Sequence, residues 1–301
     1  MTTEYAVLTI LPCLDAPGMA ASRRHELDIP SERAAALGRS TVEAAKRGYY
    51  LNGNGAKIDW RRQVKHACSA KISIPPDAAL PDCELACRPE TRVQVSNETT
   101  LQASRRLAEA GLHPIALNFA NGVHPGGGFL HGARAQEEVL CRSSALFVTL
   151  VGDPMYDYHR KRPQPDSSDW MIYSPDVPVF RSDDGTDLDQ PWLLSFLTSA
   201  APYAPAIGQP ESADLLRKRI RRILAVASAY GHGALVLGAW GCGAFANDPY
   251  RTAIDFRDAL EKDFNGRFSD VVFAITDWSP GRRFLGPFRD VFSPEAQQDT
   301  E

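Results

Sequence analysis

Three consecutive glycines, Gly126 to Gly128, are followed after seven residues by the triplet Gln136-Glu137-Glu138. Backbone without side chains can approach a ligand closely, and its free N–H groups can cradle phosphate oxygens. Carboxylates in a first helical turn often only complement the helix dipole, but they can also supply an acid or a base. A diphosphate anchor beside a carboxylate provides what the cleavage of a glycosidic bond requires.

The two carboxylates cannot act as an ordinary glycosidase pair. Neighbouring residues on a helix point roughly 100° apart, so Glu137 and Glu138 do not flank one bond. One should transfer a proton while the other holds a hydroxyl group. Position alone does not say which residue has which role.

A second glycine-rich loop, residues 238–247, follows the predicted strand 234–237 and leads into Asp248-Pro249, a typical cap and first turn of a helix. Helix N-termini favour anions, so the two loops could hold the two sides of a diphosphate. The alternative is two unrelated tight turns. Phe245 in this loop suits packing over a ribose or a base, although it could also belong to the core.

These loops need an α/β scaffold, and the pattern from residue 92 onward predicts one. Strands are expected at 92–95, 114–119, 193–198, 234–237 and 270–276, and helices at 99–110, from 136 past 147, at 211–230 and from 249. Residues 152–191 are rich in Pro and Asp and are predicted as an excursion with short strands such as 171–173. The alternation predicts a sheet with helices on both faces and ligands at the carboxyl ends of its strands.

The region before this alternation has a different character. A helix is expected from about Ile29-Pro30 to Gly48, a small hairpin around residues 52–55, and a connector over 74–91. We therefore predict an N-terminal, mainly helical accessory region at 1–90, packed on a catalytic domain at 91–301.

The motifs resemble those of one family. The run from Gly126 to Glu138 is similar to the GGG-x(6–8)-QEE signature of poly(ADP-ribose) glycohydrolases, and residues 118–121 and 241–248 resemble the bacterial-type branch. The resemblance extends over about residues 30–290. It implies a macrodomain-like, three-layer α/β/α fold with a mixed central sheet that binds ADP-ribose.

The resemblance also implies roles for individual residues. Glu138 would be the catalytic acid, and Glu137 would hydrogen-bond the ribose beside the scissile linkage. Asn121 would hold ribose hydroxyls, and Gln136 is counted among the substrate-binding positions. The remaining substrate contacts would come from Gly126, Gly127 and Gly128 and from Gly241, Cys242, Gly243 and Ala244 around the diphosphate, with Phe245 on the ribose.

The predicted activity is hydrolysis of ribose–ribose O-glycosidic bonds in poly(ADP-ribose), mainly from the chain end, to release ADP-ribose and reverse ADP-ribosylation in a DNA damage response. Substrates would be the polymer or ADP-ribosylated proteins. The alternatives are a macrodomain that binds ADP-ribose without cleaving it and a mono-ADP-ribosyl hydrolase. No cofactor and no metal is expected.

Composition sets further expectations. The net charge of -4 and the pI near 6.0 provide no global basic field for duplex DNA or an anionic membrane. Six irregularly spaced cysteines predict reduced thiols, and the start of the chain is not typical of a signal peptide. We expect a monomer in the cytoplasm, or in the nucleus of a eukaryote. The basic cluster 217–222 is predicted to be a solvated helix face, and a phosphate contact by Arg134 is the less favoured alternative.

Overall fold

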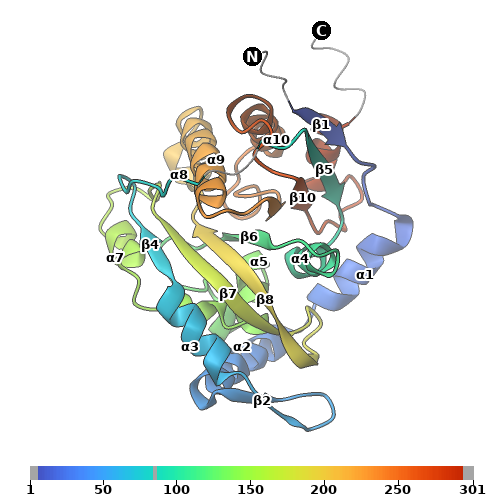
Figure 1. The fold of residues 1–301 in the computed structure, drawn as a ribbon, viewed down its shortest axis with the longest axis vertical. Helices are drawn as coiled ribbons and strands as arrows, with labels where there is room; N and C mark the ends of the chain where they lie inside the picture. Colours follow the sequence, from blue (N-terminus) through green and yellow to red (C-terminus); the bar gives the residue numbers. More distant parts are fainter. Residues whose placement is uncertain (1–5, 84–86, 294–301) are drawn as a thin grey trace.

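The computed structural model describes residues 6–83 and 87–293, and its centre is an eight-stranded mixed sheet (Figure 1). The strand order is β1-β5-β10-β9-β6-β8-β7-β4. The six strands from β1 to β8 pair in parallel, whereas β7 pairs antiparallel with β8 and with β4. The strands are Val7–Ile10 (β1), Ile72–Ile74 (β4), Glu90–Ser96 (β5), Pro114–Phe119 (β6), Met171–Arg181 (β7), Asp187–Ser199 (β8), Ala234–Leu237 (β9) and Asp270–Ala274 (β10).

Helices occupy both faces of this sheet. They are Pro17–Leu27 (α1), Ser31–Arg47 (α2), Arg61–Ala70 (α3), Thr100–Glu109 (α4), Gln136–Ser143 (α5), Leu146–Leu150 (α6), Pro154–Arg160 (α7), Ala204–Ile207 (α8), Glu211–Ala229 (α9), Pro249–Asp258 (α10) and Leu285–Val291 (α11). A 3-10 turn at Phe129–His131 and a π-helical turn at Ala259–Asp263 complete the helical segments of the described residues. A two-stranded hairpin, Tyr49–Leu51 (β2) and Lys57–Asp59 (β3), lies with α2 and α3 at the lower end of the molecule in Figure 1.

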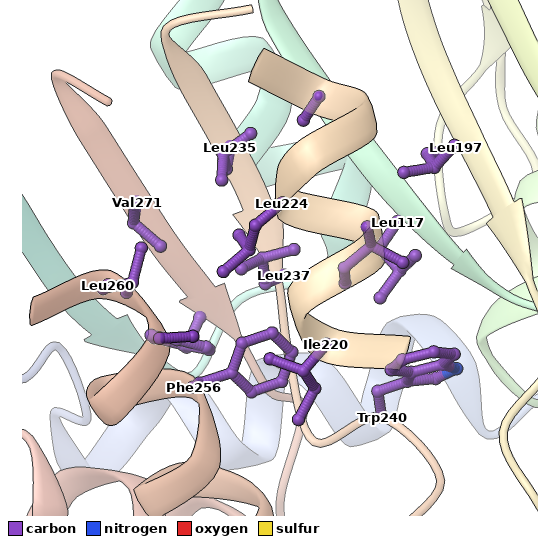
Figure 2. Close-up of a cluster of buried hydrophobic side chains, with 14 of the residues drawn as sticks. Leu117, Leu197, Ile220, Leu224, Leu235, Leu237, Trp240, Phe256, Leu260 and Val271 are labelled. Carbon is purple, nitrogen blue, oxygen red and sulfur yellow. The ribbon is translucent and has the colours of Figure 1, made fainter. Parts of the chain in front are cut away.

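The alternation of side chains along the strands builds one core on each face of the sheet. On β9, Leu235 and Leu237 face the core under α9 and α10, while Ala234 and Val236 face the core under α4 and α5. Figure 2 shows the first core, where Ile220 and Leu224 of α9 pack toward β9 and its neighbours. Burying one such aliphatic side chain contributes about 1.5–3 kcal/mol, so these two layers hold the strand ends in fixed positions.

Two caps fix the helices that begin beside the strand ends. Thr99 accepts the N–H of Gln102 at 3.0 Å and forms a capping box at the start of α4. Asp248 accepts the N–H of Tyr250 at 2.8 Å and precedes Pro249 in α10, as its sequence predicts.

The structure corrects the predicted single helix from residue 136 past 147. Ser144 has extended backbone (φ -143°, ψ 173°) and forms a bridge with Val179 of β7, so α5 ends at Ser143 and α6 begins at Leu146. The prediction of an excursion with only short strands over 152–191 is also wrong in part. Residues 171–181 form a long strand, β7, whose pairing with β8 extends the sheet.

The predicted solvated face at 217–222 also needs correction. Arg219 is 1% exposed, and it donates to Asp169 and, at 3.0 Å, to the carbonyl of Ala200. Arg217 and Lys218 are exposed, whereas Arg221 and Arg222 are half-buried, and Arg222 donates to the carbonyls of Asp169 and Pro75. The cluster therefore includes cations that join α9 to neighbouring segments.

Residues before position 91 supply both edge strands of the central sheet. β1 pairs with β5 and β4 pairs with β7, while α2 contacts α5. The boundary near residue 90 stays a prediction. Among residues 6–83 and 87–293, no helix combines the length and the apolar character that crossing a bilayer requires. All six cysteines are free thiols.

Candidate active site

A cavity of about 400 Å³ lies at the carboxyl ends of β6, β9 and β10, where the fold predicts a ligand. The second glycine-rich loop, the start of α5 and Asn121 line it, whereas the predicted substrate-binding glycines Gly126, Gly127 and Gly128 are not on its wall. Its wall carries the carboxylates Glu98 and Asp183, and at the start of α5 Glu137 and Glu138 stand side by side. The residues of these segments on the wall are Asn121, Gln136, Glu137, Glu138, Gly241, Gly243, Ala244 and Phe245.

Glu137 is 3% exposed, and both of its carboxylate oxygens accept N–H groups from the end of β6 and the loop after it. The N–H of Asn121 donates to Oε2 at 2.7 Å, and Nδ2 of Asn118 donates to Oε1 at 3.3 Å. Burial is the main reason why the pKa of Glu137 is raised to about 8, against the lowering effect of these donors. A carboxyl group of this kind carries a proton through most of the neutral range.

Glu138 is 8% exposed and has an asymmetric environment. Its Oε1 accepts the N–H of Gly128 at 3.0 Å, whereas Oε2 is buried and has no hydrogen-bond partner among the described residues. A buried carboxylate oxygen without a partner is costly. This oxygen is therefore available to a group that enters the cavity.

The conformation of the first glycine loop depends on the absence of side chains. Gly126 and Gly127 have φ values of 71° and 56°, in the left-handed region. A Cβ atom on Gly127 would collide with Oε1 of Glu138 and would lie 3.1 Å from Oε2 of Glu137. Gly127 thus allows the loop to lie directly against both carboxylates.

Gln136 anchors the start of α5 to the sheet. Its Oε1 accepts the N–H of Phe119 at 2.9 Å, and its Nε2 donates to Leu117 O at 2.7 Å and to Thr100 Oγ1 at 3.1 Å. These bonds occupy both ends of the amide. The predicted substrate contact of Gln136 stays a prediction, and the geometry favours a positioning role.

The side chain of Asn121 organises the loop that follows β6. Its Oδ1 accepts the N–H groups of Val123 at 3.0 Å and His124 at 2.9 Å, which forms a tight turn. Because its own N–H binds Glu137, Asn121 ties the loop to the first carboxylate and still lines the cavity.

The second glycine loop is fixed by Asn247, which is 3% exposed. Its Nδ2 donates to the carbonyls of Pro202 at 2.9 Å and Gly241 at 3.1 Å. Gly241 has a φ of 77°, and a Cβ on Gly243 would meet nothing within 4 Å. This loop therefore presents open backbone to the cavity.

Cys242 points away from the cavity. Its thiol is 2% exposed and lies 3.6 Å from Thr252 Oγ1, and burial raises its pKa to about 12. The side chain of Cys242 is therefore not available to a ligand in the cavity, and only its backbone could make the predicted substrate contact.

Phe245 forms part of the cavity wall and packs edge-on against Tyr203, with ring centroids 5.7 Å apart and an interplanar angle of 88°. The carbonyl of Phe245 accepts the N–H of Ala204 at 3.0 Å. Its ring is thus supported from behind by the segment that precedes α8.

His159 of α7 supports the segment that follows β6, a role that the sequence did not reveal. Its Nε2 accepts the N–H of Ser168 at 3.0 Å, so its Nδ1 carries the proton and donates to Gly122 O at 2.9 Å. Burial lowers the pKa of His159 to about 4 and keeps this ring neutral. The residue lies in the segment predicted as an excursion, where no periodic pattern marks it.

Arg134 lines the cavity and is tied to the N-terminal region, and its phosphate contact stays a prediction. Its Nη1 donates to Asp28 Oδ1 at 2.8 Å and to Ile29 O at 2.7 Å, which attaches the end of α1 to the cavity rim. Among the residues that the structure describes, no cluster of three or more His, Cys, Asp and Glu side chains is arranged to hold a metal ion.

The raised pKa of Glu137 predicts a pH-dependent stability. Its pKa is about 8 in the folded protein and near 4.5 when unfolded, so the folded state holds the proton more tightly. The contribution of Glu137 to stability is then largest at low pH and falls by up to about 1.4 kcal/mol per pH unit between these values. Chemical denaturation at pH 5.5 and 7.5 should show that Glu137→Gln loses this decrease, while the control Glu109→Gln keeps it. If the free energy of unfolding of Glu137→Gln fell with pH as much as that of wild type, the raised pKa of Glu137 would be contradicted.

The fold and the site together define a macrodomain-like α/β protein with a carboxylate pair at its ligand cavity. Residues 38–182 match the family model of the microbial-type PARG catalytic domain. The crystal structure of poly(ADP-ribose) glycohydrolase (PARG) from Thermomonospora curvata is 41% identical, with a TM-score of 0.81 over 86% of this chain and 99% of that chain. The chain therefore belongs to the microbial-type poly(ADP-ribose) glycohydrolase family.

Two further solved structures contain ligands. The Thermomonospora curvata glycohydrolase bound to the inhibitor ADP-HPD is 42% identical, with a TM-score of 0.80 over 86% of this chain and 99% of that chain. The Deinococcus radiodurans enzyme in complex with ADP-ribose is 38% identical, with a TM-score of 0.69 over 75% of this chain and 96% of that chain. The search of curated proteins finds no match.

Proposed function

We propose that this protein hydrolyses the ribose–ribose O-glycosidic bonds of poly(ADP-ribose) from the chain end and releases ADP-ribose. Membership of the glycohydrolase family supports the activity, and the relatives solved with ADP-ribose and with ADP-HPD support the ligand class. The observation that carries the mechanism is the free Oε2 of Glu138 at the cavity.

Glu138 is proposed as the acid that protonates the leaving oxygen. Its Oε1 is held by Gly128, which leaves Oε2 to meet the substrate. Proton transfer from Oε2 breaks the bond between the terminal ribose and the oxygen of the next unit, through an oxocarbenium-like transition state. The resulting carboxylate can then take a proton from the attacking water.

Glu137 is proposed to hold a hydroxyl group of the terminal ribose. A raised pKa is also typical of a general acid, so the pKa alone would favour Glu137 for that role. The geometry argues otherwise, because both of its oxygens already accept N–H groups from β6 and its loop. A protonated Glu137 retains one O–H to donate to a hydroxyl oxygen.

The two glycine loops are proposed to hold the diphosphate. Backbone N–H groups of the second loop can serve anionic oxygens without the desolvation of a buried cation, and α10 begins directly after this loop. In the first loop the N–H groups of Gly127 and Gly128 already bind His124 O and Glu138 Oε1, so this loop would contribute by close approach of its backbone. The acid of this mechanism is a side chain, so we propose that catalysis needs no metal ion.

Phe245 is proposed to press the ribose toward Glu138. We expect Phe245→Ala to lower kcat on the order of a hundredfold, because small misplacements of reacting groups can cost that much. Steady-state kinetics on polymer would measure the change, and ADP-ribose titration would separate it from weaker binding. An unchanged kcat would show that the ring only lines the wall.

A time course on long protein-attached polymer tests the function. We expect free ADP-ribose from the first time point, no early mid-length oligomers, and one unit left on the protein. Turnover should persist in EDTA. Binding without any turnover would favour the non-catalytic macrodomain, and release from mono-modified protein would favour the mono-ADP-ribosyl hydrolase. Early free oligomers would contradict attack from the chain end.

A further inference from the structure

The loop that follows β6, residues 120–124, orients a side chain on the cavity wall. That side chain is Asn121, whose own N–H donates to Oε2 of Glu137 at 2.7 Å. Oδ1 of Asn121 accepts the N–H groups of Val123 at 3.0 Å and of His124 at 2.9 Å. The direction of the Asn121 amide therefore depends on the two peptide units that supply these N–H groups.

Two neighbouring side chains of α7 hold the other end of both peptide units. Nδ1 of His159 donates to the carbonyl of Gly122 at 2.9 Å, and Nη1 of Arg160 donates to the carbonyl of Val123 at 2.6 Å. Each peptide unit thus has its N–H bound by Asn121 and its C=O bound by α7. We call His159 and Arg160 together the α7 clamp.

The ring of His159 is held in one tautomer and one orientation. It is 4% exposed, and its Nε2 accepts the N–H of Ser168 at 3.0 Å. Because a backbone N–H only donates and a carbonyl only accepts, Nδ1 carries the proton. A Cβ atom on Gly122 would lie 2.5 Å from Ser167 Oγ and 3.3 Å from Nδ1 of His159, so the loop is packed directly against its donor. Loss of this donor would leave a buried carbonyl unpaired, which is costly.

We propose that the α7 clamp positions the active site: by fixing the two peptide units, it sets the direction of the Asn121 amide and the place where its N–H meets Glu137. With Oδ1 turned to the loop, Nδ2 is the end of the amide that donates to a ribose hydroxyl. Without the clamp the peptide units can rotate, and the amide no longer presents one fixed end to the ligand. The inference rests on the proposed roles of Asn121 and Glu137 in holding ribose hydroxyls.

The test is steady-state kinetics on polymer, together with titration of ADP-ribose, for two variants of His159. In His159→Asn the amide nitrogen stands near the place of Nδ1 and retains a donor for Gly122. In His159→Gln the longer amide reaches the place of Nε2, so it retains a partner for Ser168 but loses the donor for Gly122. We expect His159→Gln to raise the Kd for ADP-ribose about tenfold and to lower kcat/KM at least as much. His159→Asn should stay within about twofold of wild type in both quantities.

His232→Gln is the matched control. His232 is also buried, and both nitrogens of its ring are also bonded, to Tyr173 and to His113, away from the cavity wall. The control should lower the melting temperature much as His159→Gln does, and it should leave Kd and kcat/KM unchanged. A merely structural role of His159 would give this same result and would not distinguish His159→Asn from His159→Gln.

Arg160→Met tests the other half of the α7 clamp at an exposed position. It should raise the Kd for ADP-ribose about fivefold, because it releases the carbonyl of Val123. Lys161→Met removes the neighbouring exposed cation and should leave Kd unchanged. Should the His159 variants fail to fold, the comparison of Arg160→Met with Lys161→Met decides the inference.

Equal values of Kd and kcat/KM for His159→Asn and His159→Gln would overturn the inference, and so would equal values of Kd for Arg160→Met and Lys161→Met. Failure of the proposed function would appear separately, as a wild-type protein that binds ADP-ribose but releases none from polymer.

Discussion

Glu138→Gln is expected to lower kcat by about a thousandfold or more, because the amide has no proton to give to the leaving oxygen. Gln keeps the size of the side chain and can still accept the N–H of Gly128. ADP-ribose should therefore bind within about tenfold of wild type. Single-turnover kinetics on polymer, together with calorimetric titration of ADP-ribose, would measure the two effects separately.

Glu137→Gln is the matched comparison, since it makes the same change at the neighbouring position. We expect it to weaken substrate binding and turnover together, because the proposed role of the residue is to hold a hydroxyl in both the ground state and the transition state. A fully active Glu138→Gln beside an inactive Glu137→Gln would reverse the two roles.

Gly127→Ala is expected to lower kcat by a hundredfold or more without preventing folding. The added Cβ would occupy the space of Oε1 of Glu138, and the residue would also have to keep a φ of 56°. The loop or the glutamate must then move, and displacement of a catalytic group by about 1 Å can cost on the order of a hundredfold. Turnover on polymer and the melting temperature should be measured together.

Gly111→Ala controls for the backbone alone. Gly111 has a φ of 83°, and a Cβ there would meet nothing within 4 Å. It should reproduce the loss of stability caused by an unfavourable φ and leave turnover intact. Equal losses of activity in both variants would show that strain, rather than collision with Glu138, explains the effect.

The strands and loops around the cavity could be predicted because strong local signals mark them. β6 and β9 are apolar runs that end in glycine loops, and Asp248-Pro249 starts α10 where the sequence indicates. The break at Ser144 could not be predicted, since it depends on a bridge to Val179, 35 positions away. Local periodicity continues across a position where tertiary pairing ends the helix.

In the site, too, features with a local sequence signal could be predicted and features that depend on tertiary contacts could not. The glycines and the carboxylate pair form a compact motif, and its residue types indicate close backbone approach to a ligand and acid catalysis. His159 and Arg160 carry no such signal, since each matters only through contacts made across the fold, with Gly122 and with Val123. Cys242 shows the reverse error: it lies inside a functional motif, yet its side chain belongs to the core.

The strand order also determines when this protein can fold during synthesis. β10 lies between β5 and β9, so the two halves of the sheet have no direct pairing until residues 270–274 have left the ribosome. β1 is one of the first segments synthesised and pairs only with β5. Until β10 is made, these two strands belong to an incomplete sheet. Contacts that span so much of the chain slow folding, and unpaired strand edges favour aggregation. The nascent chain therefore exposes the edge of β5 from the synthesis of residue 96 until that of residue 270, and this is the segment that a chaperone would have to protect.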